Sequence, residues 1–294
     1  MRIVARWGLS RNMRKEIFMR KEYPQYSVLM SVYYKENADW LDYSIKSMLN
    51  QTIKPSEFVL IEDGKLTEEL YSVINKFIES YPDIFKVIPI KTNVGLGPAL
   101  RLGIENCKYE YIARMDSDDY SMPNRIEEEL NVFLENSNLS MVGTNVIEFI
   151  DDIKNGISKV ILPEKQNDIY VFSKKRNPFR HPSIMFKKSA VIKAGNYREY
   201  YLFEDYDLWL RMIRSGCECY NIQEFLTFMR ISSDFYKRRG GLKYLKSIYK
   251  FKIEQYKIGY ITYFEFLKSF LPHAIVCLIP NNMRDFVYKK MLRK

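Results

Sequence analysis

The stretch Tyr111-Ile-Ala-Arg-Met-Asp-Ser-Asp-Asp119 joins a short apolar run to three closely spaced carboxylates. The run Tyr111–Met115 has the length and the apolar character of a strand that is buried in a parallel sheet. Carboxylates follow this strand immediately, and ligands of α/β proteins bind beyond the carboxyl ends of parallel strands. The stretch therefore predicts both the kind of sheet and the edge at which a ligand binds.

Strands and helices alternate four times in the about 95 residues that end at this stretch. Such alternation is typical of βαβ units, in which right-handed crossovers place helices over the faces of a parallel sheet. We expect an α/β, Rossmann-like fold with a mostly parallel sheet flanked by helices, followed by a helical basic C-terminal tail. The expected strands are residues 26–33, 58–61, 84–90 and 111–115, and the expected helices are 38–49, 67–78 and 98–107.

The alternation becomes less regular after this stretch, and we interpret the following region as a second half of the same domain. The tail is expected to begin near Arg238-Arg239-Gly240-Gly241. The elements expected in this second half are a helix over 123–134, a strand over 139–149, a helix over 205–215 and a strand near 219–222.

Composition places the chain among globular proteins. Of its 294 residues, 47% are hydrophobic and 28% are charged, which excludes disordered and collagen-like chains. The longest apolar run, Ala274–Ile279, is far shorter than the about 20 residues of a spanning helix, so we expect neither a secreted nor a membrane-spanning protein. The cysteines show no zinc-site spacing and favour a reducing, cytoplasmic setting; they are Cys107, Cys217, Cys219 and Cys277.

The net charge of +10 is unevenly distributed along the chain. Residues 1–25 carry seven Lys or Arg against two Glu, and residues 235–294 carry 14 against three acids. In the tail, lysines alternate with aromatic and aliphatic residues between Leu242 and Leu271, as in helices that lie on an anionic bilayer surface. The same pattern also fits helices that pack on the domain and turn their lysines to water, and both interpretations stay open.

The group Asp116-Ser117-Asp118 carries the clearest chemical signal. Carboxylates crowded at a strand end repel one another unless a cation or a hydrogen-bond network neutralises them. Mg²⁺ or Mn²⁺ held by one or two carboxylates keeps coordination positions open for a diphosphate. A structural alternative is that Asp118 and Asp119 cap the helix that begins near Pro123, while Asp116 makes a turn.

Several segments occur in the order and spacing of the nucleotide-sugar half of the family 2 glycosyltransferases, which the chain resembles over about residues 26–235. The resemblance implies a GT-A fold and the inverting, metal-dependent transfer of a sugar from a UDP- or other NDP-sugar. The domains expected from it are a basic N-terminal arm (1–25), a GT-A domain (26–235, divided near 122 into a nucleotide-sugar half and an acceptor half) and a basic amphipathic tail (236–294). The segments are 26–34, 47–52, 58–64, 93–97, 110–113 and 116–125.

The resemblance also implies a nucleotide site in which Asp63 accepts a hydrogen bond from the uracil imide and Ser31 meets the nucleoside. Ser31-Val32-Tyr33-Tyr34 stands where the family has Pro-x-Tyr-Asn, and Glu62-Asp63-Gly64-Lys65 stands where it has Asp-Asp-Gly-Ser. These departures leave the base preference open. The residues expected at the nucleotide are Ser31, Tyr33, Asp63, Asp116, Ser117 and Asp118, and those expected at the metal, Mn²⁺ or Mg²⁺, are Asp116 and Asp118, with Asp118 as the direct ligand.

A second acidic group, Glu204-Asp205-Tyr206-Asp207, precedes an expected helix. It resembles the acceptor-side Glu-Asp motif of the family, which implies that Asp205 is the catalytic base and that Glu204 orients it or the acceptor. Inverting transfer needs one carboxylate to take the proton of the attacking hydroxyl. Acids favoured at a helix N-terminus would explain each of these residues individually. Trp209 is expected in the core.

Other polar residues are less informative on their own. His181, in His181-Pro182-Ser183, fits a structural histidine, although the segment also resembles an acceptor-loop motif of the family. Arginines are suited to bind a diphosphate, and the sequence does not choose among the candidates Arg114, Arg180, Arg198, Arg238 and Arg239.

These expectations favour a peripheral enzyme at the inner face of the cell membrane. It is expected to transfer a sugar from a UDP-sugar to a glycan or lipid-linked acceptor of a capsule, exopolysaccharide or lipopolysaccharide. One alternative is a nucleotidyltransferase that makes an activated sugar, but Tyr33-Tyr34-Lys35-Glu36 stands where its glycine-rich basic loop would be. Another is a nucleic-acid-binding protein, which the acidic middle of the chain opposes. We therefore expect no nucleic-acid partner.

Overall fold

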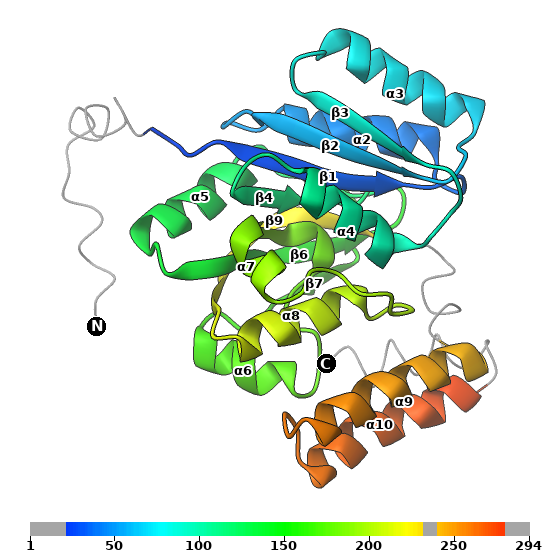
Figure 1. Ribbon diagram of the computed structural model, residues 1–294, viewed down its shortest axis with the longest axis vertical. Coiled ribbons are helices and arrows are strands. Elements are labelled where there is room, and N and C mark those ends of the chain that lie inside the picture. The colour runs from blue at the N-terminus through cyan, green and yellow to red at the C-terminus, as the bar shows by residue number, and fades with distance from the viewer. Residues whose placement is uncertain (1–21, 232–239, 280–294) are drawn as a thin grey trace.

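The computed structural model describes residues 22–231 and 240–279 and has one large sheet at its centre (Figure 1). Nine strands form it in the order β3-β2-β1-β4-β8-β6-β9-β5, with β7 paired to β6. Strands β1 to β4 are parallel, and β8 runs antiparallel between β4 and β6. The strands are Tyr26–Val32 (β1), Glu57–Asp63 (β2), Phe85–Ile90 (β3), Tyr111–Arg114 (β4), Tyr120–Ser121 (β5), Leu139–Phe149 (β6), Ser158–Val160 (β7), Ile184–Lys187 (β8) and Glu218–Arg230 (β9).

Helices cover both faces of this sheet (Figure 1). One face buries apolar side chains of α2, α3 and α5, and the other buries those of α4, α7 and α8. The expected α/β fold with a mostly parallel sheet flanked by helices is therefore confirmed. The helices are Ala38–Leu49 (α2), Glu68–Ser80 (α3), Leu96–Asn106 (α4), Arg125–Glu135 (α5), Gln166–Ser173 (α6), Lys188–Lys193 (α7) and Glu204–Arg214 (α8).

The second half of the domain departs most from the sequence expectations. The strand expected near 219–222 is β9, and it runs on to Arg230 because it continues beside β6 after irregularities in register. The sequence pattern does not predict β8, a strand of only four residues. A short buried run shows no periodicity of its own, so its place in the sheet depends on neighbours that are distant in the chain.

Two helices, α9 (Gly241–Lys257) and α10 (Tyr263–Leu278), follow the domain and lie side by side as a hairpin (Figure 1). Thr262 and Glu265 form a capping box that starts α10. Apolar residues of both helices share a core with Phe203, which is the N-cap of α8, and with Tyr206 and Leu210 of α8. The expected helical tail is confirmed, and its inner face packs on the domain.

Parts of the predicted arm and tail lie outside the described residues. Only residues 22–25 of the basic arm fall within them, and Arg238 and Arg239 do not. The domain boundaries near residues 25 and 235 stay predictions. In the described ranges, no helix combines the length and the apolarity that crossing a membrane requires.

Candidate active site

The carboxyl ends of β1, β2 and β4 meet at one edge of the sheet because these strands are parallel. Ser31 lies near the end of β1, and Asp63 is the last residue of β2. Asp116 follows β4 by two residues. Tyr33, just beyond β1, is partly exposed, and its ring meets that of Tyr34 edge-on at 5.9 Å. The fold thus brings the segments predicted to bind the nucleotide to one edge.

Asp63 is buried and holds the loop that leads into α4. Its carboxylate accepts hydrogen bonds from the Val94 N–H (2.7 Å), the Gly95 N–H (3.0 Å) and Asn93 Nδ2 (3.0 Å). Gly95 has a φ of +88°, a conformation that glycine adopts without the strain of a side chain. The structure therefore gives Asp63 a role in shaping this loop, and its contact with a nucleotide base stays a prediction.

Four acids, Glu36, Asp116, Asp118 and Asp119, form what we name the strand-end cluster. Ser117 Oγ donates to Glu36 Oε2 (2.6 Å), which ties the loop after β1 to the loop after β4. Burial raises the pKa of Asp118 to about 8, and the negative charges of Glu36 and Asp116 add to this effect. Burial also raises the pKa of Glu36. Like charges are therefore crowded here in a poorly hydrated place.

Arg230, at the end of β9, anchors this cluster to the far side of the sheet. Its Cζ lies 4.2 Å from the ring centroid of Trp40 and 4.4 Å from that of Phe149. Its Nε donates to the Asp118 carbonyl oxygen (3.0 Å), and its backbone N–H donates to Asp119 Oδ1 (2.6 Å). The guanidinium, which contacts two aromatic rings, thus fixes the backbone of the acidic loop.

Neither Asp118 nor Asp119 caps the next helix. The N-cap of α5 is Asn124, and it makes no side-chain capping hydrogen bond. Asp119 is 1% exposed, and its Oδ2 is buried and has no hydrogen-bond partner within the described part of the chain. Such an arrangement is costly. Helix capping therefore does not explain why these acids are here.

Glu204 and Asp205, in the first turn of α8, are named the helix-start pair. Asp205 Oδ2 accepts from Asn177 Nδ2 (2.6 Å), and Oδ1 accepts from the Tyr206 N–H (2.6 Å). Burial raises the pKa of Asp205, whereas these two hydrogen bonds act in the opposite direction. Burial and the charge of Asp205 raise the pKa of Glu204 to about 8.

Gly97 allows α4 to approach the helix-start pair closely. A Cβ at this position would lie 2.4 Å from the Arg198 carbonyl oxygen and 3.2 Å from Glu204 Cβ. The first turn of α4 therefore lies against the segment that leads to Glu204. This contact joins the 93–97 segment, in the predicted nucleotide-sugar half, to the predicted acceptor half.

Arg114 lies between the two acidic groups. It forms an ion pair with Asp116 and is 1% exposed. Its positive charge also lowers the pKa of Glu204 and of Asp205 against the effect of burial. Its Nε and Nη1 are buried and have no hydrogen-bond partner among the residues that the structure describes. Carboxylates that are far apart in the sequence thus share one electrostatic environment centred on this guanidinium.

His181 and Trp209 belong to the core beneath the site. His181 Nε2 lies 2.8 Å from the Tyr197 hydroxyl, and the ring centroids of His181 and Trp209 are 6.0 Å apart. Burial lowers the pKa of His181 well below its ordinary value, and the charge of Arg114 adds to this. His181 is therefore a neutral, structural histidine, and Trp209 is a core residue, as the sequence indicates.

The remaining arginine candidates are dispersed. Arg198 forms an ion pair with Glu254 of the tail (3.6 Å), and the charge of Arg180 acts on Asp205. Sequence reasoning missed three residues of the site, which are Glu36, Arg230 and Asn177. Each belongs to a loop or a strand end without a motif of its own. Only Glu36 could have been found from the sequence, because it is an acid that lies soon after the first predicted strand.

The strand-end cluster suits a divalent cation, because carboxylates and a diphosphate both bind such ions through oxygen. Within residues 22–231 and 240–279, no three His, Cys, Asp or Glu side chains converge as a complete metal site. Asp116 and Asp118 nevertheless supply hard oxygen donors of the kind that Mg²⁺ and Mn²⁺ prefer. Burial and the charges of Glu36 and Asp116 together raise the pKa of Asp118, and a cation relieves the repulsion between these charges. The residues present therefore fit such an ion.

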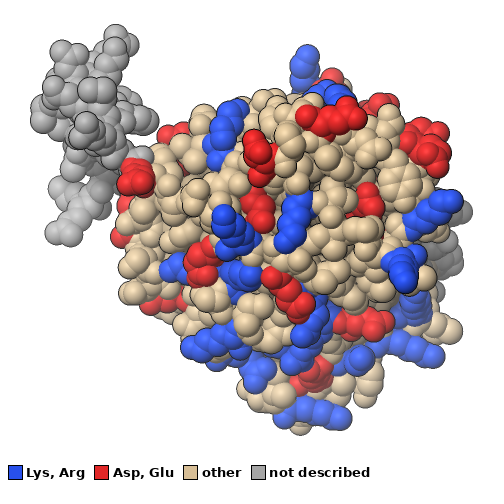
Figure 2. Space-filling view, turned by 45° about the horizontal axis from the view of Figure 1, so that its top comes forward, with Lys and Arg blue, Asp and Glu red and all other residues tan. Residues whose placement is uncertain are grey.

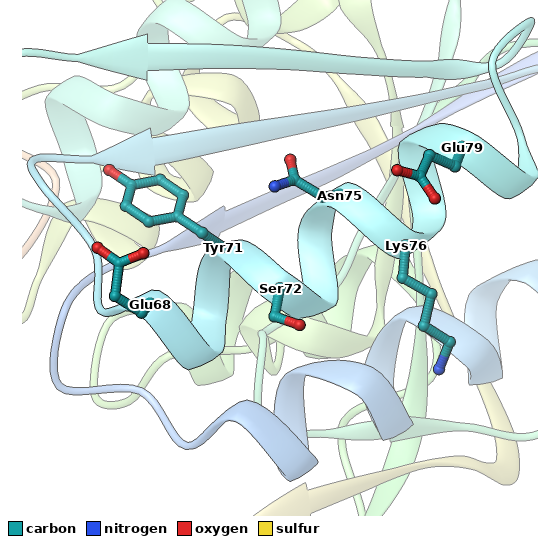
Figure 3. Close-up of a pocket in the computed structure, with 6 residues that line it drawn as sticks. All are labelled: Glu68, Tyr71, Ser72, Asn75, Lys76 and Glu79. Carbon is teal, nitrogen blue, oxygen red and sulfur yellow. The ribbon is translucent and has the colours of Figure 1, made fainter.

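The hollow drawn in Figure 3 is not this site. It lies along the outer side of α3, and all the residues that line it come from this one helix. A single helix face offers no converging groups of the kind that bind and orient a substrate. The lining residues are Glu68, Tyr71, Ser72, Asn75, Lys76 and Glu79.

Comparison with known sequences identifies the family of the chain. Residues 27–199 match the family described as Glycosyl transferase family 2. An Escherichia coli protein, UDP-Gal:alpha-D-GlcNAc-diphosphoundecaprenol beta-1,3-galactosyltransferase, is 37% identical over 277 residues, which cover 94% of this chain and 99% of that protein. Amylovoran biosynthesis glycosyltransferase AmsE of Erwinia amylovora is 34% identical, over 90% of this chain and 98% of its own.

Solved structures share the fold at low sequence identity. TarS 1-349 of S. aureus in complex with UDP-GlcNAc has a TM-score of 0.64 at 14% identity and covers 90% of this chain and 81% of its own. The mannosyltransferase PcManGT from Pyrobaculum calidifontis, in complex with GDP-Man and Mn2+, has a TM-score of 0.60 at 14% identity, over 89% and 75% of the two chains. The expected GT-A architecture is confirmed, and the chain belongs to glycosyltransferase family 2.

Proposed function

We propose that this glycosyltransferase moves a hexose from a UDP-sugar to a hydroxyl of a lipid-linked glycan, with inversion, during the synthesis of a cell-surface polysaccharide. The observation that carries this proposal is the convergence of the strand-end cluster and the helix-start pair on Arg114. One acidic group suits a metal-bound diphosphate and the other suits an acceptor hydroxyl, and transfer requires the two substrates to be adjacent. The name of the E. coli relative contains both UDP-Gal and a diphosphoundecaprenol-linked sugar, which supports this donor and acceptor.

The nucleotide would bind at the ends of β1 and β2. In this proposal Ser31 and Tyr33 contact the nucleoside, and Asp63 accepts a hydrogen bond from the uracil imide. The loop that Asp63 holds continues into α4, whose N-terminal end is favourable for negative charge. Ser117 would lie beside the diphosphate, at the turn that Glu36 fixes.

Asp118, together with Asp116, would hold Mn²⁺ or Mg²⁺. When bound, such a cation neutralises the negative charge of the departing diphosphate. The protein contributes the orientation of the ligands, since Arg230 holds the Asp118 carbonyl oxygen (3.0 Å) and Arg114 pairs with Asp116. The Mn2+ named with the similarly folded PcManGT supports the choice of ion.

Asp205 would act as the base. It takes the proton of the acceptor hydroxyl while that oxygen attacks the anomeric carbon, and the bond from this carbon to the diphosphate oxygen breaks with its electron pair on UDP. Asn177 and the Tyr206 N–H fix the orientation of the carboxylate (2.6 Å each). Glu204 would orient the acceptor. The direct attack explains inversion without a covalent sugar intermediate.

A transfer assay with the purified chain tests this function. UDP-, GDP- and dTDP-hexoses are offered in turn with Mn²⁺ and a GlcNAc-diphosphopolyprenol analogue. We expect transfer from a UDP-hexose only, and we expect the product linkage to show inversion by NMR. Transfer from GDP- or dTDP-sugars alone, or a product with retained configuration, would contradict the proposal.

The outer face of the hairpin is proposed to adsorb to an anionic membrane surface, where a lipid-linked acceptor lies. Phe264, Leu271 and Ile275 are 73%, 49% and 62% exposed, and they share one side of α10 with Lys268. Figure 2 shows Lys and Arg side chains gathered over the lower part of the molecule. Exposed apolar residues among lysines favour anionic headgroups, which supports the proposal that the protein works at the inner face of the membrane.

Co-sedimentation with liposomes tests this adsorption. We expect binding to anionic and not to neutral vesicles, weakened by salt through screening. Phe264→Ser should reduce binding, whereas Ile192→Ser, at another exposed apolar position, on α7, should not. These surface substitutions are preferable to truncation after residue 240, because the inner face of α9 shares a core with Phe203. Salt-independent absence of binding by the folded full-length chain would reject the proposal.

A further inference from the structure

Lys252 of α9 lies buried behind the helix-start pair. It is 2% exposed, and its Nζ donates to the carbonyl oxygens of Lys174 and Lys175 (3.3 Å each). The Nζ also lies 5.4 Å from the ring centroid of Tyr206. Burial lowers the pKa of Lys252 to about 8, and among the described residues no carboxylate forms an ion pair with it. Taking an amine out of water in this way is costly, so its place in the fold needs an explanation.

The two carbonyls belong to the turn that carries Asn177. Lys174 is the C-cap of α6, and a cation is favoured at the free carbonyls of a helix C-terminus. Three residues further along, Asn177 Nδ2 donates to Asp205 Oδ2 (2.6 Å). Lys252 therefore holds the backbone of the turn whose side chain holds Asp205.

Helix α9 also supports the segment 203–206, which contains Asp205. The ring of Phe251 stacks on Phe203 (centroids 4.9 Å apart) and packs against Tyr206 (4.7 Å). Glu254 accepts a hydrogen bond from the Tyr200 hydroxyl. Consecutive turns of α9 thus contact both segments that determine where the Asp205 carboxylate points.

We propose that Lys252 is a positioning residue for sugar transfer, which fixes the Lys174–Asn177 turn and, through Asn177, aims the Asp205 carboxylate at the acceptor hydroxyl. This inference rests on the proposed role of Asp205 as the base. It makes the C-terminal hairpin a part of the acceptor site, in addition to any contact of its outer face with a membrane. The donor residues belong to other loops, so the loss of Lys252 affects turnover and leaves donor binding intact.

A pair of matched substitutions in α9 tests this inference in the full-length chain. Lys252→Met removes the ammonium group and keeps an unbranched apolar side chain. Lys246→Met makes the same change at an exposed position of the same helix. For Lys252→Met we expect kcat to fall by about tenfold to a hundredfold, with the donor Kd and KM within about twofold of the parent values. Lys246→Met should match the parent. Unchanged kcat, or a weakened donor Kd with normal kcat, would overturn the inference.

A double-variant cycle separates a link through Asn177 from a general loosening of the fold. Both substitutions break the same line of contacts from Lys252 through Asn177 to Asp205. The kcat of the double variant, Lys252→Met with Asn177→Ala, should therefore be no lower than that of Asn177→Ala alone. Losses that multiply would overturn the inference. If Lys252→Met does not fold, Asn177→Ala tests the same link in a loop, and a normal kcat for it would count against the inference.

Asp205→Asn distinguishes this inference from the proposed function. Normal turnover by Asp205→Asn would remove the proposed base and the inference with it. Loss of turnover in Asp205→Asn, together with normal turnover in Lys252→Met, would leave the base in place and reject only the positioning role of Lys252.

Discussion

The strand-end cluster and the helix-start pair are both acidic, yet they are built in different ways. At the strand end, Asp118 has other acids as neighbours, and their charges add to the burial that raises its pKa to about 8. At the helix start, Asp205 receives two hydrogen bonds of 2.6 Å that act against the effect of burial. Crowded acids favour the binding of a cation, whereas a carboxylate held by fixed donors is oriented for proton transfer.

The comparison teaches that local donors, and not the number of acids, distinguish the roles of neighbouring carboxylates. The positive charge of the buried Arg114 guanidinium acts to lower the pKa of acids in both groups. They differ in what else surrounds them, which is Glu36 for one and Asn177 for the other. Substitutions on each side should therefore affect different steps of the reaction.

The largest effect is expected for Asp205→Asn. The amide keeps the shape of the side chain and cannot accept a proton, so kcat should fall by roughly 10²- to 10⁴-fold. Donor affinity should be retained, because the substitution lies outside the strand-end cluster. Steady-state kinetics and calorimetry with UDP-sugar measure the two quantities. Normal turnover by Asp205→Asn, together with loss of turnover in Glu204→Gln, would identify Glu204 as the base instead.

The next effect is expected for Asp118→Asn on donor binding. Removal of this charge weakens the cation site, so metal-dependent UDP binding should weaken by about a hundredfold. Calorimetry with Mn²⁺ and with a chelator measures it, and Asp168→Asn, an exposed acid on α6, is the control. Equal UDP affinity with and without the chelator in the parent chain would show that the cluster does not act through a metal.

A smaller effect, on stability, is expected for Arg230→Met. The substitution removes the contacts with Trp40 and Phe149 and the hydrogen bond to the Asp118 carbonyl oxygen. We expect the free energy of unfolding to fall by about 2 kcal/mol, measured by urea denaturation. Arg101→Met, which breaks an exposed ion pair with Glu105 and a long hydrogen bond to the Tyr197 carbonyl oxygen (3.4 Å), should cost less than about 1 kcal/mol. Equal losses of unfolding free energy in the two variants would show that Arg230 does not anchor the acidic loop.

The smallest effect concerns pH and Glu204. Its pKa is raised to about 8 in the folded chain, so the folded state binds this proton more tightly than the unfolded state. The resulting stability is present at low pH and is lost as the pH rises through about 8. Between pH 5 and pH 8, the Tm of Glu204→Gln should fall less than that of the parent, by on the order of a few degrees. Parallel Tm curves would contradict the raised pKa, and Glu199→Gln, at an exposed position, is the control.

The sequence by itself determined the parallel half of the fold and the identity of both acidic groups. Helix α2 and strand β6 have the predicted bounds, Ala38–Leu49 and Leu139–Phe149. These elements follow from the periodicity of apolar side chains, which is a local property of the chain. The resemblance to family 2 glycosyltransferases singled out Asp118 and Asp205 by their positions after a strand and before a helix.

Only the tertiary structure decided which residues surround these carboxylates. Glu36, from the loop after β1, and Arg230, from the end of β9, contact the acidic loop after β4. Lys252 acts on the helix-start pair from the tail through Asn177. Such neighbours are far apart in the sequence, and their contacts depend on the strand order β4-β8-β6-β9 and on the packing of α9 against α8. Periodicity specifies which face of an element is buried, but the partner against which it is buried is chosen by the packing of the whole chain.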